Sequence, residues 1–206
     1  MTNSHEALGD QSWEPLSPTA VKELLQGQSE APWWLAGGYA LELFAGRSWR
    51  SHDDIDVLVL RRDQHAIQEW LRGWEVYAAD PPGRLRRWRF GEWLAPGVHD
   101  LWCRETGDSP WRIQVMLDEA EGDRWVSRRD SRVTCSVESL GLTSAEGIPY
   151  LAPEVQLFYK ARGVRPKDEL DFDTVTPLLS AAQRDWLRDA LSATHPGHPW
   201  TSRLPS

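Results

Sequence analysis

The protein has 206 residues, of which 31 are acidic and 23 basic, so its net charge at pH 7 is −8. This balance argues against a dedicated nucleic-acid-binding protein, because such proteins usually present a basic surface to the phosphates. No stretch approaches the roughly 20 apolar residues of a membrane span, and the polar N-terminus is unlike a secretory signal, so we expect a cytoplasmic protein without a membrane segment.

The first predicted elements are a helix, a strand and a second helix. Ser17 and Pro18 are typical of a helix N-cap and first turn, so a helix is expected to run to about Gln26, after a loose lead-in over residues 1–16. Residues 33–35 predict a short apolar strand that leads into Gly37 and Gly38, and residues 39–44 have helical spacing. This segment therefore predicts a strand, a glycine turn and a helix.

The middle of the chain predicts several strands. Residues 55–60 are apolar and rich in β-branched side chains, which indicates a buried strand, and a helix is expected from about residue 63 to 72. Shorter strands are expected at 75–79, 85–90, 98–104 and 111–117. A few helices combined with hairpin-linked strands predict a mixed α/β or α+β fold that is not doubly wound.

The last quarter of the chain predicts helices only. One begins at Pro153 and ends near Gly163, and two more are expected over residues 167–175 and 180–191. We therefore expect a first domain over residues 17–148 and a helical domain over residues 149–206.

Asp54 and Asp56 are the residues most informative about function. On a strand both would point to the same side, while Ile55 between them faces the core. Two carboxylates held so close repel each other unless a cation lies between them. Mg²⁺ suits such a site, because carboxylates, phosphate oxygens and water complete its coordination, and two ions can hold both reacting oxygens of a phosphoryl displacement.

Gly37 and Gly38 supply the second half of this prediction. Backbone N–H groups at the start of a helix, unobstructed by side chains, form a cradle for an anion. Alone, a Gly-Gly turn is usually only a turn, and an Asp-x-Asp sequence is usually solvated surface. At this spacing, the two together favour a site for a nucleoside triphosphate.

These residues resemble the signature of a known family. Trp34, Gly37-Gly38-Tyr39-Ala40, Gly46-Arg47, Arg50, His52 and Asp54-Ile55-Asp56 follow, almost position for position, the pattern of the aminoglycoside 2''-adenylyltransferase-like branch of the nucleotidyltransferase superfamily, which has the DNA polymerase β-like fold. The resemblance is strong over residues 33–60 and moderate over the C-terminal helices. It implies a mixed sheet with flanking helices, a C-terminal helical domain, and an active site in the cleft between them.

The resemblance also implies a reaction, the Mg²⁺-dependent transfer of a nucleoside monophosphate, AMP from ATP or the equivalent from another triphosphate, to a hydroxyl group. Asp54 and Asp56 would bind the metal ions, two being expected, and a third carboxylate would bind metal or take the acceptor's proton. Asp100 is the first candidate for this carboxylate. Asp118 is the second, because the strand over 111–117 is expected to end beside it, whereas Gln114 cannot play this role.

Four basic residues are candidates for binding the nucleotide. Arg47 and Arg50 have the forked geometry that suits phosphate oxygens. His52 is a candidate for orienting Asp54 or a phosphate, and Lys160 resembles the triphosphate-contacting lysine of related folds. Each has an equally good structural explanation, as a solvated arginine, a packing histidine or an exposed lysine.

Other charged groups bear on the acceptor. Acidic residues gather in the C-terminal helices, where they would form an acidic wall that attracts a polycation such as an aminoglycoside: Glu154, Asp168, Glu169, Asp171 and Asp173. We therefore expect a small acceptor that carries hydroxyl groups. If it is an aminoglycoside, it is also cationic. The basic run over residues 84–89 alternates like an edge strand with a charged face, which favours contact with solvent over contact with nucleotide.

Two alternatives stay open. The first keeps the chemistry and makes the acceptor a protein or tRNA, as in toxin–antitoxin nucleotidyltransferases, although the acidic charge weighs against tRNA. The second is a catalytically silent member of the superfamily that binds a nucleotide.

Overall fold

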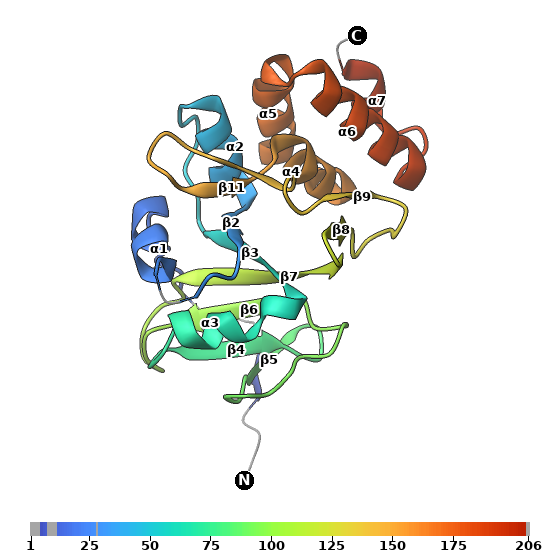
Figure 1. Ribbon diagram of the computed structural model, residues 1–206. Coiled ribbons are helices and arrows are strands. Elements are labelled where there is room, and N and C mark those ends of the chain that lie inside the picture. The colour runs from blue at the N-terminus through green and yellow to red at the C-terminus, as the bar shows by residue number, and fades with distance from the viewer. Residues whose placement is uncertain (1–4, 8–11, 28, 205–206) are drawn as a thin grey trace.

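A mixed sheet runs through the molecule in the computed structural model, which describes residues 5–7, 12–27 and 29–204 (Figure 1). Its main path has the order β1-β5-β4-β6-β7-β3-β2-β11-β10, and β8 and β9 extend it from β7. The pairs β3–β7 and β2–β11 are parallel, and the other pairs are antiparallel. The strands are β1 His5–Ala7, β2 Trp33–Leu35, β3 Asp56–Leu60, β4 Glu75–Ala79, β5 Arg84–Arg87, β6 Asp100–Arg104, β7 Ile113–Glu121, β8 Arg124–Val126, β9 Thr134–Ser136, β10 Gly141–Thr143 and β11 Pro149–Leu151.

Helices flank this sheet. Figure 1 shows α4 to α7 gathered at one end of the molecule, with α3 beside β4 and β6 at the other. The helices are α1 Pro18–Leu25, α2 Gly37–Ala45, α3 His65–Trp70, α4 Pro153–Lys160, α5 Pro166–Val175, α6 Ala181–Thr194 and α7 Pro199–Arg203, with short 3₁₀ turns at Arg61–Asp63, Ala161–Gly163 and Thr176–Leu178. The predicted mixed fold is confirmed. Within the described residues, no helix has both the length and the apolar character to cross a membrane.

Side-chain caps explain where two of the predicted helices begin. The Ser17 hydroxyl accepts a hydrogen bond from the Ala20 N–H, 3.2 Å away, at the start of α1. At the start of α6, Ser180 and Gln183 form a reciprocal capping box. Both starting points agree with the sequence-based predictions.

Strand pairing between distant segments changes several predicted boundaries. Strand β7 does not end at residue 117 but continues to Glu121, because β8 pairs with its last three residues. Asp118 therefore lies within the strand and not beyond its end. Strand β5 lies between β1 and β4 and is not an edge strand. The short strands β8 to β11 are not predicted from the sequence, because three residues carry too little alternation to be recognised.

The sheet and the C-terminal helices share one hydrophobic core. Val57 of β3, Phe158 of α4 and Leu187 of α6 are all buried in the same cluster. Strand β11 begins at residue 149, where the helical domain was expected to start, and pairs with β2 in the sheet. The division into two domains at residue 148 stays a prediction.

A buried carboxylate at the junction of α5 and the loop after α2 ties these parts together. Asp171 is fully buried and accepts hydrogen bonds of 2.9 Å from Nε and Nη2 of Arg50 and from Nε1 of Trp49. The Lys160 ammonium lies 3.0 Å from the same carboxylate. Burial opposes ionisation, but the bonds to Arg50 and Lys160 outweigh it, and the pKa of Asp171 lies below its usual value.

We expect Asp171→Asn to lower the free energy of unfolding by about 3 kcal/mol, because it leaves two buried cations without their shared counter-charge. Chemical denaturation of both proteins measures the difference. The group's low native pKa stabilises the fold above its unfolded pKa of 3.8, so the difference should shrink as the pH falls through that value. Asp185→Asn, at an exposed ion pair with Arg188, is the control and should change stability by less than about 0.5 kcal/mol. Equal effects of the two substitutions would contradict this account.

Candidate functional site

Asp54 and Asp56 stand where the chain enters β3. Ile55 between them is fully buried, as expected, while both aspartates stay partly exposed. Burial, which is the largest cause, and the negative charges of Asp54 and Asp100 together raise the pKa of Asp56 to about 7, against the opposing charge of Lys160. At neutral pH the protein therefore holds a carboxylate that ionises only with difficulty unless a cation approaches.

Asp100 joins this pair through the register of the sheet. In β7, Gln114 pairs directly with Asp56 of β3, and Met116 pairs with Asp100 of β6. Paired residues point to the same face of a sheet, so Asp56, Gln114 and Asp100 share one face. The Gln114 amide donates a hydrogen bond of 3.3 Å to Oδ1 of Asp100. The first candidate for the third carboxylate thus lies one strand beyond Gln114, close enough to influence Asp56.

Asp118 lies elsewhere on the same strand. It lies four positions beyond Gln114 in β7, which corresponds to ~13 Å along the strand. It is 1 % exposed and accepts hydrogen bonds from the Tyr159 hydroxyl and from Nε1 of Trp125 at 2.7 Å. The structure therefore places the second candidate in a separate buried cluster, away from Asp56.

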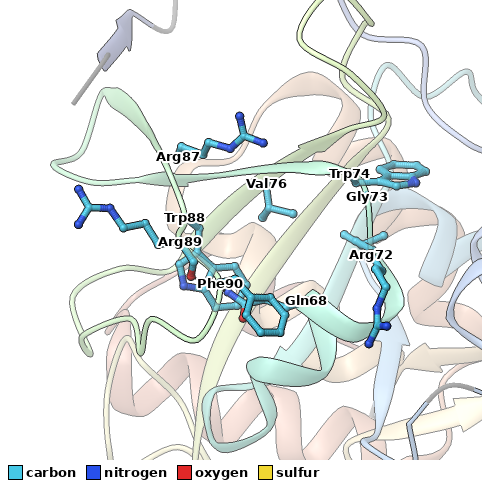
Figure 2. A pocket seen from close by; sticks show the side chains of 10 residues that line it. Gln68, Arg72, Gly73, Trp74, Val76, Arg87, Trp88, Arg89 and Phe90 are labelled. Carbon is cyan, nitrogen blue, oxygen red and sulfur yellow. Dashed lines mark hydrogen bonds between the residues drawn. The ribbon is translucent and has the colours of Figure 1, made fainter. Parts of the chain in front are cut away.

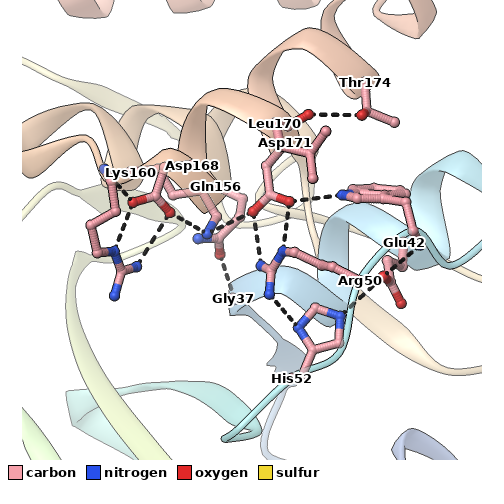
Figure 3. A network of polar contacts seen from close by, with 12 residues as sticks. Gly37, Glu42, Arg50, His52, Gln156, Lys160, Asp168, Leu170, Asp171 and Thr174 are labelled. Atoms are coloured by element: carbon pink, nitrogen blue, oxygen red, sulfur yellow. Dashed lines mark hydrogen bonds and ion pairs between the residues drawn. The ribbon is translucent and has the colours of Figure 1, made fainter.

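The glycine pair is required for close approach. Gly37 has φ +66°, and a Cβ there would lie 2.4 Å from Oδ2 of Asp56. A Cβ on Gly38 would lie 2.1 Å from the His52 ring. The Gly37 N–H, expected to face a phosphate, donates instead to the side-chain oxygen of Gln156, 2.8 Å away (Figure 3). The turn is thus shaped around Asp56 and joined to α4.

Arg50 and His52 lie behind the glycine turn and bind protein groups. Figure 3 shows the Arg50 guanidinium between Asp171 and the His52 ring, and its Nη1 lies 2.9 Å from Nδ1 of His52. The other ring nitrogen of His52 lies 3.1 Å from Glu42. Burial and the charge of Arg50 lower the pKa of His52. Neither side chain lines the pocket at Asp56, so the structure places both as supports of the turn.

Lys160 and Arg47 occupy different surroundings. Lys160 is the last residue of α4, and its ammonium bridges Asp168 at 2.9 Å and Asp171 at 3.0 Å while lining the pocket at Asp56. Lys160 therefore links the end of α4 to two carboxylates of α5. Arg47 is exposed and lines another pocket, between α1 and α2.

A pocket of about 420 Å³ opens beside Asp56. Its walls carry five cationic side chains and two carboxylates, together with small and neutral residues: Gly37, Asp56, Met116, Arg128, Arg129, Gln156, Tyr159, Lys160, Arg162, Gly163, Arg165 and Asp168. Gly37, Asp56 and Lys160 were predicted from the sequence as site residues, whereas the four arginines were not. The only local signals for them are the adjacent Arg128-Arg129 and the spacing of Arg162 and Arg165 after α4. An anion with several charges would be stabilised here.

The basic run over residues 84–89 is not part of this pocket. Arg87 and Arg89 line a different pocket of about 410 Å³, between α3 and the end of β5, whose lining is mainly apolar. Figure 2 shows the guanidinium groups of Arg72, Arg87 and Arg89 pointing in three different directions. No common anion site is formed by them.

The expected acidic wall is neutralised within the helical part of the protein. Asp168 and Asp171 are paired with cations, as described above. Glu169 and Asp173 both bind Arg203. Glu154 accepts a hydrogen bond of 2.9 Å from Gln183. These carboxylates therefore do not form the free acidic surface that the sequence suggested.

The carboxylates at Asp56 fit a hard cation. The charge repulsion that raises the pKa of Asp56 would be relieved by a divalent ion, and oxygen ligands are those Mg²⁺ prefers. Within the described part of the chain, no cluster of three or more His, Cys, Asp or Glu side chains is arranged to hold a metal by itself. Mg²⁺ sites in proteins commonly use one or two carboxylates and complete the coordination with substrate oxygens and water.

Substitution of Gly37 by Ala tests the role of the turn. Gly46 has the same φ of +66° but no atom within 4 Å of an added Cβ, so Gly46→Ala measures the backbone strain alone. We expect that strain to be about 1 kcal/mol, and Gly37→Ala to lose about 2 kcal/mol more, because the methyl group displaces Asp56. Urea denaturation measures both. Equal losses of stability in Gly37→Ala and Gly46→Ala would refute the role of the turn.

Substitution of Asp56 by Asn tests whether ionisation of this buried carboxyl group destabilises the fold. The native pKa of about 7 lies above the unfolded value of 3.8, so ionisation weakens the fold progressively between these values. Without divalent ions, Asp56→Asn should be more stable than the wild type above pH 7, by about 2 kcal/mol after allowing for the group's partial exposure, and no more stable below pH 3.8. Adding Mg²⁺ should stabilise the wild type only. Parallel pH profiles of the two proteins would count against the prediction.

Comparisons with known proteins agree with the observed fold. One solved structure, of ANT(2")-Ia in complex with adenylyl-2"-tobramycin, has 18% sequence identity, covers 85% of this chain and 97% of its own, and has a TM-score of 0.55. Another, of the lincosamide antibiotic adenylyltransferase LnuA bound to lincomycin, has 12% identity, covers 78% of this chain and 93% of its own, and has a TM-score of 0.50. At these identities the likenesses establish the fold. No curated protein matches the sequence.

The family itself is shown by the sequence. The model of the aminoglycoside-2''-adenylyltransferase family matches residues 19–175, well over half of the chain. The matched segment includes the glycine turn, the carboxylates of β3 and β6, and the pocket-lining residues of α4. The chain belongs to the aminoglycoside-2''-adenylyltransferase family and is a nucleotidyltransferase.

Proposed function

We propose that the protein transfers AMP from ATP to a hydroxyl group of an antibiotic, an aminoglycoside being the first candidate, and that the reaction requires Mg²⁺. The observation that carries this proposal is the pocket in which Asp56 faces five cationic side chains. A metal-binding carboxylate opposite a cationic wall matches a nucleoside triphosphate, which carries both metal and negative charge. Membership of the family supports the adenylyl group as the one transferred.

Each side of the pocket has a defined task in this proposal. Asp54 and Asp56 hold Mg²⁺, which when bound neutralises charge on the reacting phosphate. Asp100 accepts the proton of the acceptor hydroxyl at Oδ2, because its Oδ1 already accepts from Gln114. The acceptor oxygen then bonds to the α-phosphorus, the bond from that phosphorus to the β-phosphate oxygen breaks, and pyrophosphate leaves with the bonding electron pair.

Lincosamides are a second candidate class of acceptor. Of the five carboxylates of the helical part, four are paired with Arg or Lys side chains and only Glu154 has a neutral partner, Gln183, so they provide little free charge to attract a polycation. This favours an acceptor recognised through fewer positive charges than an aminoglycoside carries. One of the two structural neighbours described above is bound to lincomycin, which belongs to this less cationic class.

The direct test measures pyrophosphate release by the full chain with ATP, Mg²⁺ and tobramycin, lincomycin or no acceptor. We expect acceptor-dependent release and a product heavier than the acceptor by one adenylyl group. Asp54→Asn, Asp56→Asn and Asp100→Asn should each lower kcat by about 100-fold or more, because metal binding and proton transfer each contribute at least that factor.

Asp53→Asn is the matched control, since Asp53 is exposed and adjacent to Asp54 but lies outside the pocket. It should retain the wild-type rate. Release that is unaffected by Asp56→Asn would overturn the assigned roles. Metal-dependent ATP binding without release for any acceptor tested would instead favour a catalytically silent protein.

A further inference from the structure

Three arginines crowd the end of the pocket that lies away from Gln114. Arg128 and Arg129 follow β8, and Arg162 follows α4. Burial lowers the pKa of Arg129, and the charges of Arg128 and Arg162 lower it further. Cations that repel one another in a pocket are stabilised when an anion binds among them.

Asp118 and Tyr159 contact two of these arginines and fix their positions. Arg128 Nε lies 3.5 Å from Oδ1 of Asp118, and the guanidinium carbon of Arg129 lies 4.7 Å from the centre of the Tyr159 ring. Arg129 also donates from Nη1 to the Tyr159 carbonyl. The Tyr159 hydroxyl and Trp125 Nε1 donate to Oδ2 of Asp118, which keeps Oδ1 turned toward Arg128. The arginines are thus fixed by a buried cluster.

The Arg128 side chain lines the pocket. Among the described residues, nothing forms a hydrogen bond with the two terminal nitrogens of Arg128, which lines the pocket with 17% of its side chain exposed. Met116 forms the floor between this end and Gln114, which pairs with Asp56. Along β7 the distance from Gln114 to Asp118 is ~13 Å. A chain of phosphates that starts at Asp56 would therefore point its far end toward Arg128.

We propose that Arg128 and Arg129 bind the terminal phosphates of the nucleotide, and that Asp118 and Tyr159 are positioning residues that aim the two guanidinium groups. The identity of the ligand as a nucleoside triphosphate rests on the proposed function. The polyphosphate site itself rests on the pocket and its contacts. In this scheme the pyrophosphate formed by the reaction is held by Arg128 and Arg129 until it leaves.

Inorganic tripolyphosphate is the probe, because it lacks the nucleoside and needs no acceptor. Calorimetric titration of the full chain without divalent ions, at constant ionic strength, measures its affinity. We expect Arg128→Gln and Arg129→Gln each to weaken binding by about tenfold or more, as loss of a charge-assisted contact predicts. Arg86→Gln is the control, because that side chain is 19% exposed, forms ion pairs on β5 and lies outside the pocket. It should bind as the wild type does.

The positioning role is tested by Tyr159→Phe and Asp118→Asn. Tyr159→Phe keeps the ring under Arg129 and removes only the hydroxyl that orients Asp118. Both variants should bind tripolyphosphate more weakly than the wild type and more tightly than Arg128→Gln, with a raised KM for ATP and a nearly unchanged kcat. A purely structural role would lower thermal stability and leave the affinity of the folded protein unchanged. If Asp118→Asn does not fold, Tyr159→Phe decides.

The outcomes separate this inference from the proposed function. Wild-type affinity in Arg128→Gln and Arg129→Gln would overturn the polyphosphate site, even if pyrophosphate is released with an antibiotic. Loss of affinity in both would support the site, even if no acceptor gives release. Wild-type affinity and KM in a folded Tyr159→Phe would overturn the positioning role.

Discussion

Opposite charges face each other across one pocket, and the rest of the site depends on keeping them apart. On one wall, burial makes Asp56 difficult to ionise, and the negative charges of Asp54 and Asp100 add to the difficulty. On the other wall stand five Arg and Lys side chains, of which Lys160 and Arg165 are paired with Asp168 while Arg128, Arg129 and Arg162 make no ion pair with Asp56. If Asp56 and these basic side chains were in direct contact, their charges would neutralise each other, and the pocket would have no charge left to bind a ligand. The sheet prevents this by placing the acidic groups at the start of β3 and on β6, while the arginines follow β8 and α4. A ligand that carries metal and phosphate satisfies both walls at once.

Much of the surrounding structure holds this separation in place. Gly37 leaves room for the Asp56 carboxylate, and its N–H is bonded to Gln156 of α4. Asp171 gathers Arg50 and Lys160 at the junction of the sheet and the helices. These contacts use residues that the sequence suggested for phosphate binding. Their protein partners make them part of the scaffold, and the proposed role of binding the terminal phosphates falls to Arg128 and Arg129, which follow β8.

The sequence predicts those parts of the site that local rules determine. Asp54 and Asp56 are recognisable because alternation along a strand places them on one side, and Gly37 because a turn before a helix needs it. Asp118 was misplaced because the end of β7 depends on pairing with β8, a segment too short to recognise. Arg128 was missed because its neighbours across the pocket come from distant parts of the chain. The role of Asp171 was not predicted for the same reason, because its partner Arg50 lies 121 residues away.

The central claim is that burial and acidic neighbours hinder the ionisation of Asp56 until a cation binds. The most direct measurement is its pKa, followed by carboxyl-carbon NMR of the full chain with and without Mg²⁺ and ATP. The account predicts a value of about 7 without the ligands and a value below that of an ordinary aspartate, 3.8, when both are bound. An unperturbed value near 3.8 without ligands, or a value that metal and nucleotide do not change, would contradict it.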